Sequence, residues 1–320
     1  MLRSPVTLWL SSIMAFCAAD KSFVLPPPAG KSGETVALVL IQGASSPPGG
    51  YRPFLEALQK VSPLPLWVGV PEFIADTPQP LQFNSKLKES LGAMAKAGMV
   101  ANRTVLLAHS LGGVFAQQHV VSSSGSDVDA LVLYGATVLR KYRNATFAAP
   151  VLTVDGELDG LLRISRQAEA WWHQVHRAGG SITKPVALLP GLNHWSISSG
   201  PPPPNVRSHD LPSEVAADDG HAAIASVVSS FLVSLFGSSA AKSAAATAMT
   251  KVLDTTAKLV APLIEALELE GSSHLNPPCE SDYPTNPSCA YPKWPDKSLL
   301  PVSPTPNAAS SSGHQPLLPT

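Results

Sequence analysis

The sequence is poor in charge, in cysteine and in long apolar runs. Charged residues make up 14% of the 320 positions, and the formal net charge is −1. There is no run of basic residues that would bind nucleic acid and no acidic tail. Beyond the amino-terminal segment, no apolar stretch is long enough to cross a bilayer. The sequence therefore argues against a nucleic-acid-binding or membrane-spanning protein.

Apolar residues and prolines are abundant instead. Apolar residues account for 44% of the chain, which is enough to bury a sizeable core, and the 32 prolines concentrate after the first 200 residues. A chain of this length accommodates one large domain with extra segments. The composition therefore predicts a folded body followed by an irregular tail.

The amino terminus has the pattern of a secretory signal. Arg3 supplies a positive charge, residues 6–15 are short and apolar, and small residues precede Asp20. We expect a signal peptide over residues 1–19 and a protein that is secreted or resides in the lumen of the secretory pathway. An uncleaved anchor or a buried strand is the alternative interpretation of this segment.

The cysteine pattern fits export. Cys17 would leave with the signal peptide, and Cys279 and Cys289 would form a local disulfide in an oxidising compartment. Sequons at Asn102 and Asn144 predict a glycoprotein.

Buried apolar runs alternate with helical patterns along the body of the chain. Continuous β-branched runs such as VALVLI are typical of strands that are covered on both faces of a parallel sheet. The expected strands are 36–41, 64–70, 104–108, 131–134, 151–154 and 185–189, and the expected helices are 53–61, 81–99, 112–121, 162–177 and 221–236.

This alternation predicts an α/β fold with a mostly parallel sheet flanked by helices. We expect the α/β domain over residues 20–237. An Ala-rich helical segment would follow over 238–270, and a Pro-rich tail with one disulfide loop over 271–320. Functional residues in such sheets lie in the loops after the strands.

Ser110 is the candidate nucleophile. It lies in Ala108-His109-Ser110-Leu111-Gly112-Gly113, between an expected strand and an expected helix. A serine hydroxyl must be exposed on a sharp turn and lie close to a base, and small residues two before and two after it let the turn close. Ala108 replaces the glycine that is usual at the first of these positions. We expect His109 to pack beneath the site.

Four segments together resemble the α/β-hydrolase superfamily. The segments QGA, AHSLGG, GELDG and LNHW follow one another in the order oxyanion loop, nucleophile, acid and base. The resemblance covers residues 36–236, and the short segment between Gly135 and Ala149 is similar to that of compact serine esterases such as dienelactone hydrolases and chlorophyllases. It implies the α/β-hydrolase fold and an esterase activity.

The same resemblance places the catalytic acid at Asp159. Asp155 and Glu157 are rival carboxylates in the same loop. The spacing Asp-x-Glu-x-Asp-Gly is also that of a calcium loop, but the position of its last ligand is Arg166, which cannot bind a cation.

His194 is the candidate base because it follows the last expected strand and comes after Ser110 and Asp159. The backbone N–H groups of Ala44 and Leu111 would form the oxyanion hole. An ordinary strand-ending turn is the alternative for the loop around Ala44.

Three aromatic residues lie in or near the expected site loops and would line the substrate pocket or belong to the core: Tyr51, Phe73 and Trp195. The long link 196–220 would form either a lid over the site or a surface segment that has no role in the site. The sequence thus predicts a secreted serine hydrolase that cleaves small-molecule or lipid-like carboxylic esters without a cofactor or metal. The alternatives are a non-catalytic secreted binding protein of the same fold and an acyltransferase. The oligomeric state is not specified by the sequence.

Overall fold

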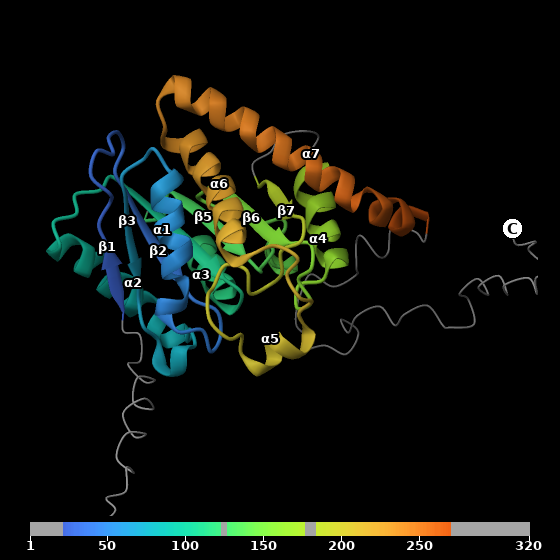
Figure 1. Cartoon of the computed structure of the whole chain (residues 1–320), viewed down its shortest axis with the longest axis horizontal. Coiled ribbons are helices and arrows are strands. Elements are labelled where there is room, and N and C mark those ends of the chain that lie inside the picture. Colours follow the sequence, from blue (N-terminus) through green and yellow to red (C-terminus); the bar gives the residue numbers. More distant parts are fainter. Residues whose placement is uncertain (1–21, 123–126, 177–183, 270–320) are drawn as a thin grey trace, which may run out of the picture.

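The computed structural model describes residues 22–122, 127–176 and 184–269 (Figure 1). Its centre is a seven-stranded sheet with the order β1-β3-β2-β4-β5-β6-β7. β1 pairs antiparallel with β3, and all other neighbouring strands are parallel. The strands are β1 Phe23–Leu25, β2 Val36–Ile41, β3 Leu66–Val70, β4 Arg103–His109, β5 Ala130–Tyr134, β6 Val151–Gly156 and β7 Val186–Leu189.

Seven α-helices accompany the sheet in the described residues. They are α1 Arg52–Val61, α2 Pro80–Lys96, α3 Leu111–Ser122, α4 Ile164–Trp171, α5 Pro204–His209, α6 Ala217–Phe236 and α7 Ser239–Leu269. The mostly parallel sheet, the flanking helices and the helical extension confirm the predicted fold class, and the strand order is consistent with an α/β-hydrolase-like fold. The predicted signal peptide and the predicted disulfide at Cys279 and Cys289 lie outside the described residues.

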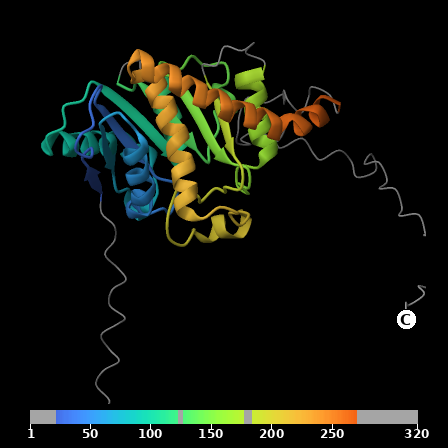
Figure 2. The same cartoon turned by 45° about the horizontal axis from the view of Figure 1, so that its top comes forward.

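The alternation of side chains along β2 divides the core into two layers. Val36, Leu38 and Leu40 join one apolar cluster with α1 and α6. The intervening Val39 and Ile41 join the opposite cluster with α2 and α3. Successive side chains of a strand point to opposite faces, so a run that is apolar at every position requires helices on both faces. The sheet is therefore held between two helical layers, as Figure 2 shows.

α6 is long and apolar enough to cross a membrane by composition alone, but more than half of its apolar window is buried inside the protein. It packs against α1 and the sheet as a core helix. α7 follows it and runs across β7 to α4 (Figures 1 and 2). The N–H of Leu188 in β7 donates to Thr256 Oγ1 of α7 at 2.8 Å, so α7 covers the edge of the sheet.

Apart from boundary shifts of a few residues, three differences from the predicted elements stand out. β1 is a three-residue edge strand that the sequence did not reveal. α5 is a short helix inside the Pro-rich link, where its first residue is a proline. The helix expected over 162–177 is α4 followed by a π-helical turn, Trp172–His176.

Candidate active site

Ser110 stands on a strained turn at the carboxyl end of β4, immediately before α3. Its φ of 51° lies in the left-handed region, which a residue with a Cβ adopts at an energetic cost. The backbone N–H of Ser110 donates to the carbonyl of Tyr134 at 2.9 Å, which fixes the turn against the end of β5. This is the sharp strand-to-helix turn that the sequence predicts for a nucleophile.

Two glycines allow the turn to close. A Cβ on Gly112 would lie 2.5 Å from the carbonyl oxygen of Gln42, and a Cβ on Gly113 would lie 2.7 Å from the Cβ of Ala136. No larger residue fits at either place without displacing the backbone or a neighbouring strand end. Ala108, which departs from the usual glycine, is fully buried and its methyl group packs in the cluster beneath α3.

Asp159 lies in the loop after β6, and its carboxylate contacts His194. Asp159 Oδ2 lies 2.6 Å from His194 Nδ1, and Asp159 Oδ1 accepts the N–H groups of Leu161 and Leu162 at 2.8 and 2.6 Å. Burial acts to raise the pKa of Asp159, but the hydrogen bond and charge of His194 lower it below its ordinary value. Asp159 is therefore an ionised partner for the imidazole.

The two rival carboxylates are differently placed. Asp155 is fully buried at the end of β6, and burial, reinforced by the nearby Asp159, raises its pKa well above the ordinary value. One of its oxygens accepts the N–H of Gly156 at 2.8 Å. Glu157 is half-exposed and accepts the N–H of Gly191 at 3.4 Å. Of the three, Asp159 alone makes a hydrogen bond to the imidazole of His194 in the described structure.

The imidazole of His194 is buried beside the nucleophile turn. Because Nδ1 donates to Asp159, the neutral ring carries its lone pair on Nε2, and Nε2 has no hydrogen-bond partner among the described residues. A Cβ on Gly135 would lie 2.7 Å from His194 Cε1, so the ring rests directly on that glycine. Gly135 adjoins Tyr134, the residue whose carbonyl holds Ser110. Ser110 and His194 therefore both contact the turn after β5, and no hydrogen bond joins them in the described structure.

Two backbone donors that the sequence assigns to an oxyanion hole are unused: the N–H of Leu111, which follows Ser110, and that of Ala44, in the loop after β2. Within the described chain, neither the N–H of Ala44 nor that of Leu111 makes a hydrogen bond to a protein acceptor. Both residues are half-exposed, and Leu111 is the first residue of α3, where the helix dipole favours negative charge. Unused donors of this kind are what an oxyanion hole requires.

A buried chain of hydrogen bonds ties the predicted oxyanion loop, residues 42–44, to the histidine loop. The hydroxyl of Tyr51 accepts the N–H of Gly43 at 2.9 Å and lies 2.8 Å from His109 Nδ1. His109 Nε2 lies 3.1 Å from the carbonyl of His194, which can only accept, so Nε2 carries the proton and Nδ1 accepts from the hydroxyl of Tyr51. Burial lowers the pKa of His109 well below its ordinary value and raises that of Tyr51, which keeps both side chains neutral.

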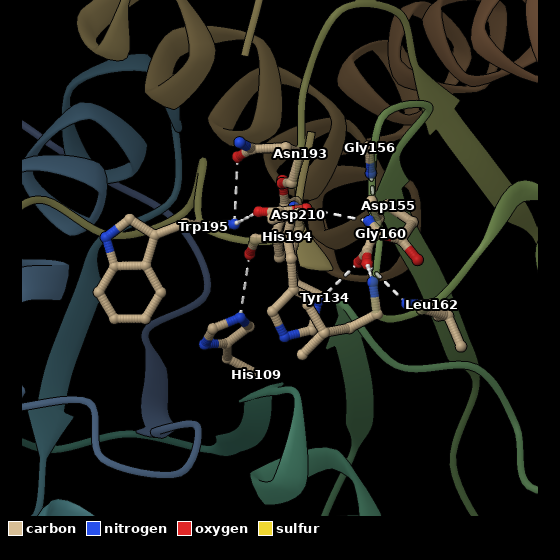
Figure 3. A network of polar contacts seen from close by, with 12 residues as sticks. His109, Tyr134, Asp155, Gly156, Gly160, Leu162, Asn193, His194, Trp195 and Asp210 are labelled. Atoms are coloured by element: carbon tan, nitrogen blue, oxygen red, sulfur yellow. Dashed lines mark hydrogen bonds and ion pairs between the residues drawn. The ribbon is translucent and has the colours of Figure 1, made fainter. Parts of the chain in front are cut away.

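Asp210, from the link between His194 and α6, holds the same loops from the other side. Its Oδ1 accepts the N–H groups of Gly160 and His194 at 3.0 and 3.1 Å, and its Oδ2 accepts the N–H of Trp195 at 3.2 Å (Figure 3). A Cβ on Gly160 would lie 1.7 Å from the carbonyl oxygen of His209, so the link lies directly on the acid loop. Neither Asp210 nor the contacts of Tyr51 and His109 carry a signal in the sequence that would have revealed them.

The aromatic residues expected near the pocket are all buried. Tyr51 and Phe73 belong to opposite core clusters. The hydroxyl of Tyr51 already takes part in the hydrogen bonds with Gly43 and His109. Trp195 is 8% exposed, and its indole N–H donates to the carbonyl of Gly200 at 2.9 Å. These contacts assign Tyr51 and Trp195 to supporting the loops.

The remaining predictions concern modification and metal. Asn102 and Asn144 are both exposed, so their side chains are accessible, and their glycosylation stays a prediction. Among the described residues no group of three or more His, Cys, Asp or Glu side chains is arranged to hold a metal ion. In the segment that resembles a calcium loop, the carboxylate of Asp159 instead bonds to the imidazole of His194 and to the backbone N–H groups of Leu161 and Leu162.

Comparison with known proteins gives distant structural likenesses. No family model matches the chain, and no curated protein matches it in sequence. The solved structure of an esterase domain from a Rhodothermus marinus protein aligns with 65% of this chain and 90% of its own, at 12% sequence identity and a TM-score of 0.41. A likeness this distant says nothing about chemistry, so the functional proposal depends on the residues of this chain alone.

Proposed function

We propose that the protein is a secreted serine hydrolase that cleaves carboxylic esters through an acyl-enzyme, with Ser110 as nucleophile, His194 as base and Asp159 as acid. The observation that carries the proposal is the buried hydrogen bond between Asp159 and His194, beside a serine on a strained strand-to-helix turn. An aspartate that fixes the tautomer of a histidine next to an activated serine is the arrangement that nucleophilic acyl transfer needs.

The proposed reaction proceeds in two steps. Ser110 Oγ attacks the ester carbonyl carbon while His194 Nε2 accepts the hydroxyl proton, and the developing oxyanion accepts hydrogen bonds from the N–H groups of Ala44 and Leu111. The tetrahedral intermediate collapses when His194 returns that proton to the departing alcohol. Water then attacks the acyl-enzyme with the same base, which releases the acid and regenerates Ser110.

The unpartnered His194 Nε2 fits this scheme. A buried ring nitrogen without an acceptor or donor costs free energy, and such a position persists where a substrate complex supplies the partner. Hydrogen bonds between nucleophile and base commonly tighten only when substrate is bound. Catalysis would therefore begin with the hydroxyl of Ser110 rotating onto His194 Nε2.

A test combines Ser110→Ala with an exposed-serine control. Ser226, whose hydroxyl bonds only within α6, supplies the control variant Ser226→Ala. We expect Ser110→Ala to reduce kcat for a short-chain p-nitrophenyl ester by at least about 10³-fold, with an unchanged circular dichroism spectrum and melting temperature. A fluorophosphonate probe should label the parent protein and Ser226→Ala but not Ser110→Ala.

The alternatives differ in their outcomes. Unlabelled parent protein without turnover would refute the hydrolase proposal and favour a secreted binding protein of this fold. Ester formation with an added alcohol, in preference to release of free acid, would favour an acyltransferase. Export is a separate part of the proposal: amino-terminal sequencing of protein collected outside the producing cell should begin at Asp20.

A further inference from the structure

A cavity lies at the end of the sheet opposite Ser110. It has a volume of about 790 Å³, within the range of small-molecule sites. Its walls come from the loop before β6, the residues before β7, and facing parts of α6 and α7. The catalytic loops follow the carboxyl ends of β6 and β7, whereas this cavity lies at their amino ends. The two sites are therefore separated by the length of the strands.

The appended helix α7 creates the cavity. Met249 and Leu253 of α7 face Phe231 and Leu235 of α6 across it, and Phe147 closes it from the loop before β6. This lining is mainly apolar, and the hydroxyls of Ser234 and Thr250 already bond within their own helices, to the carbonyls of Phe231 and Ala246. A ligand here would place an apolar body between the two helices.

Lys184 is the one charged side chain in the lining, immediately before β7. Its ammonium donates to the carbonyl of Ala145 at 3.2 Å and lies 4.6 Å from the centre of the Phe147 ring. No carboxylate in the described part of the chain forms an ion pair with it. Burial lowers the pKa of Lys184, because the charged form has lost water without gaining a counter-ion. An ammonium has three donors, so donors remain for an anion.

We propose that this cavity is a binding site for a small amphiphilic monocarboxylate, with the carboxylate on Lys184 and the aliphatic chain between α6 and α7. A single cation at an apolar cavity matches one negative charge on an apolar body, whereas phosphates and other dianions would be left with excess charge. A neutral lipid would leave the half-buried ammonium uncompensated. The site does not depend on the proposed esterase chemistry.

The test measures binding of dodecanoate and of dodecanol to the full chain by isothermal titration calorimetry, below their micellar concentrations. We expect one saturable site that prefers dodecanoate. Lys184→Met should weaken dodecanoate about tenfold and leave dodecanol unchanged, so that the preference disappears. Lys258→Met, at an exposed lysine elsewhere on α7, should bind like the parent protein.

Two further variants locate the ligand. Thr250 is an exposed position on the cavity wall, so Thr250→Trp should fill the cavity and abolish binding while α7 remains folded by circular dichroism. Ser110→Ala should bind dodecanoate like the parent protein, which separates this site from the catalytic one. Absence of saturable binding, equal affinity of dodecanoate in Lys184→Met, or loss of binding in Ser110→Ala would each overturn the proposal.

Discussion

Tyr51→Phe removes one oxygen atom from the centre of the hydrogen-bond chain between the oxyanion loop and the histidine loop. In the parent protein the Tyr51 hydroxyl accepts from Gly43 and donates to His109, whose other nitrogen donates to the carbonyl of His194. Tyr51 and His109 are 0% and 1% exposed, so water does not replace the lost oxygen. The substitution creates almost no cavity, so its effect reports the polar contacts alone.

The size of the effect follows from the two groups left without partners. A buried donor or acceptor that loses its partner costs about 1–3 kcal/mol. The Gly43 N–H and His109 Nδ1 together therefore predict a loss of about 3 kcal/mol, which lowers the melting temperature by about 6–12 °C for a domain of this size. The Gly43 bond also positions the neighbouring Ala44, so we expect kcat to fall about 10–100-fold with little change in KM.

The assay pairs thermal unfolding with steady-state ester hydrolysis at a temperature where both proteins are folded. Tyr142→Phe is the matched control, because it removes the same atom from a half-buried ring whose hydroxyl makes no hydrogen bond in the described structure. Nitrogen NMR of the parent protein should show His109 neutral with the proton on Nε2. A melting temperature and kcat for Tyr51→Phe that match those of Tyr142→Phe would refute the positioning role.

Three further perturbations test the same site. Gly135→Ala would place a methyl group 2.7 Å from His194 Cε1 at a residue whose φ is +59°. We therefore expect kcat to fall at least about 100-fold while the circular dichroism spectrum stays unchanged. A kcat close to that of the parent protein would contradict the packing of the His194 ring on Gly135. Asp210→Ala leaves the backbone N–H groups of Gly160 and His194 without an acceptor, whereas the N–H of Trp195 still donates to Asn193 Oδ1. It should lower the unfolding free energy in urea by about 3 kcal/mol, with partial recovery in Asp210→Asn. The lowered pKa of His109 means that the unfolded chain takes up a proton below about pH 6.5 while the folded chain does not. Stability should therefore decline from pH 7 to pH 5, and His109→Gln should flatten that decline in melting scans; an equal slope in both proteins would count against a neutral His109.

The sheet was predictable because its strands carry their own signal. Val36–Ile41 is apolar at every position, and the structure buries every one of those residues between two helical layers. β1 was missed because three residues of moderate burial carry no period, and its place is set by pairing with Val68, Gly69 and Val70 of β3. The helix boundaries shifted by a few residues where terminal turns are decided by local packing.

The candidate site was predictable to the extent that its residues follow strand ends. Ser110, Asp159 and His194 come after β4, β6 and β7, and the geometry of a parallel sheet brings such positions to one edge. Asp210 lies within a Pro-rich link, where nothing local distinguishes it from other acidic residues. Its three contacts depend on how the link folds back, which is a tertiary property. The neutral state of His109 likewise depends on burial that the sequence does not display.

The contacts of Asp210 also decide between the two interpretations of the long link after the histidine. A lid must lift away from the site, but this segment contributes the carboxylate that accepts the backbone N–H of His194, and its His209 carbonyl lies against Gly160. Lifting it would break the support of the base loop. The link near Asp210 therefore acts as a clamp on the acid and base loops. Because Ser110 and Ala44 are half-exposed whereas His194 is 2% exposed, the proposed ester substrate would approach Ser110 from the side of the loop around Ala44.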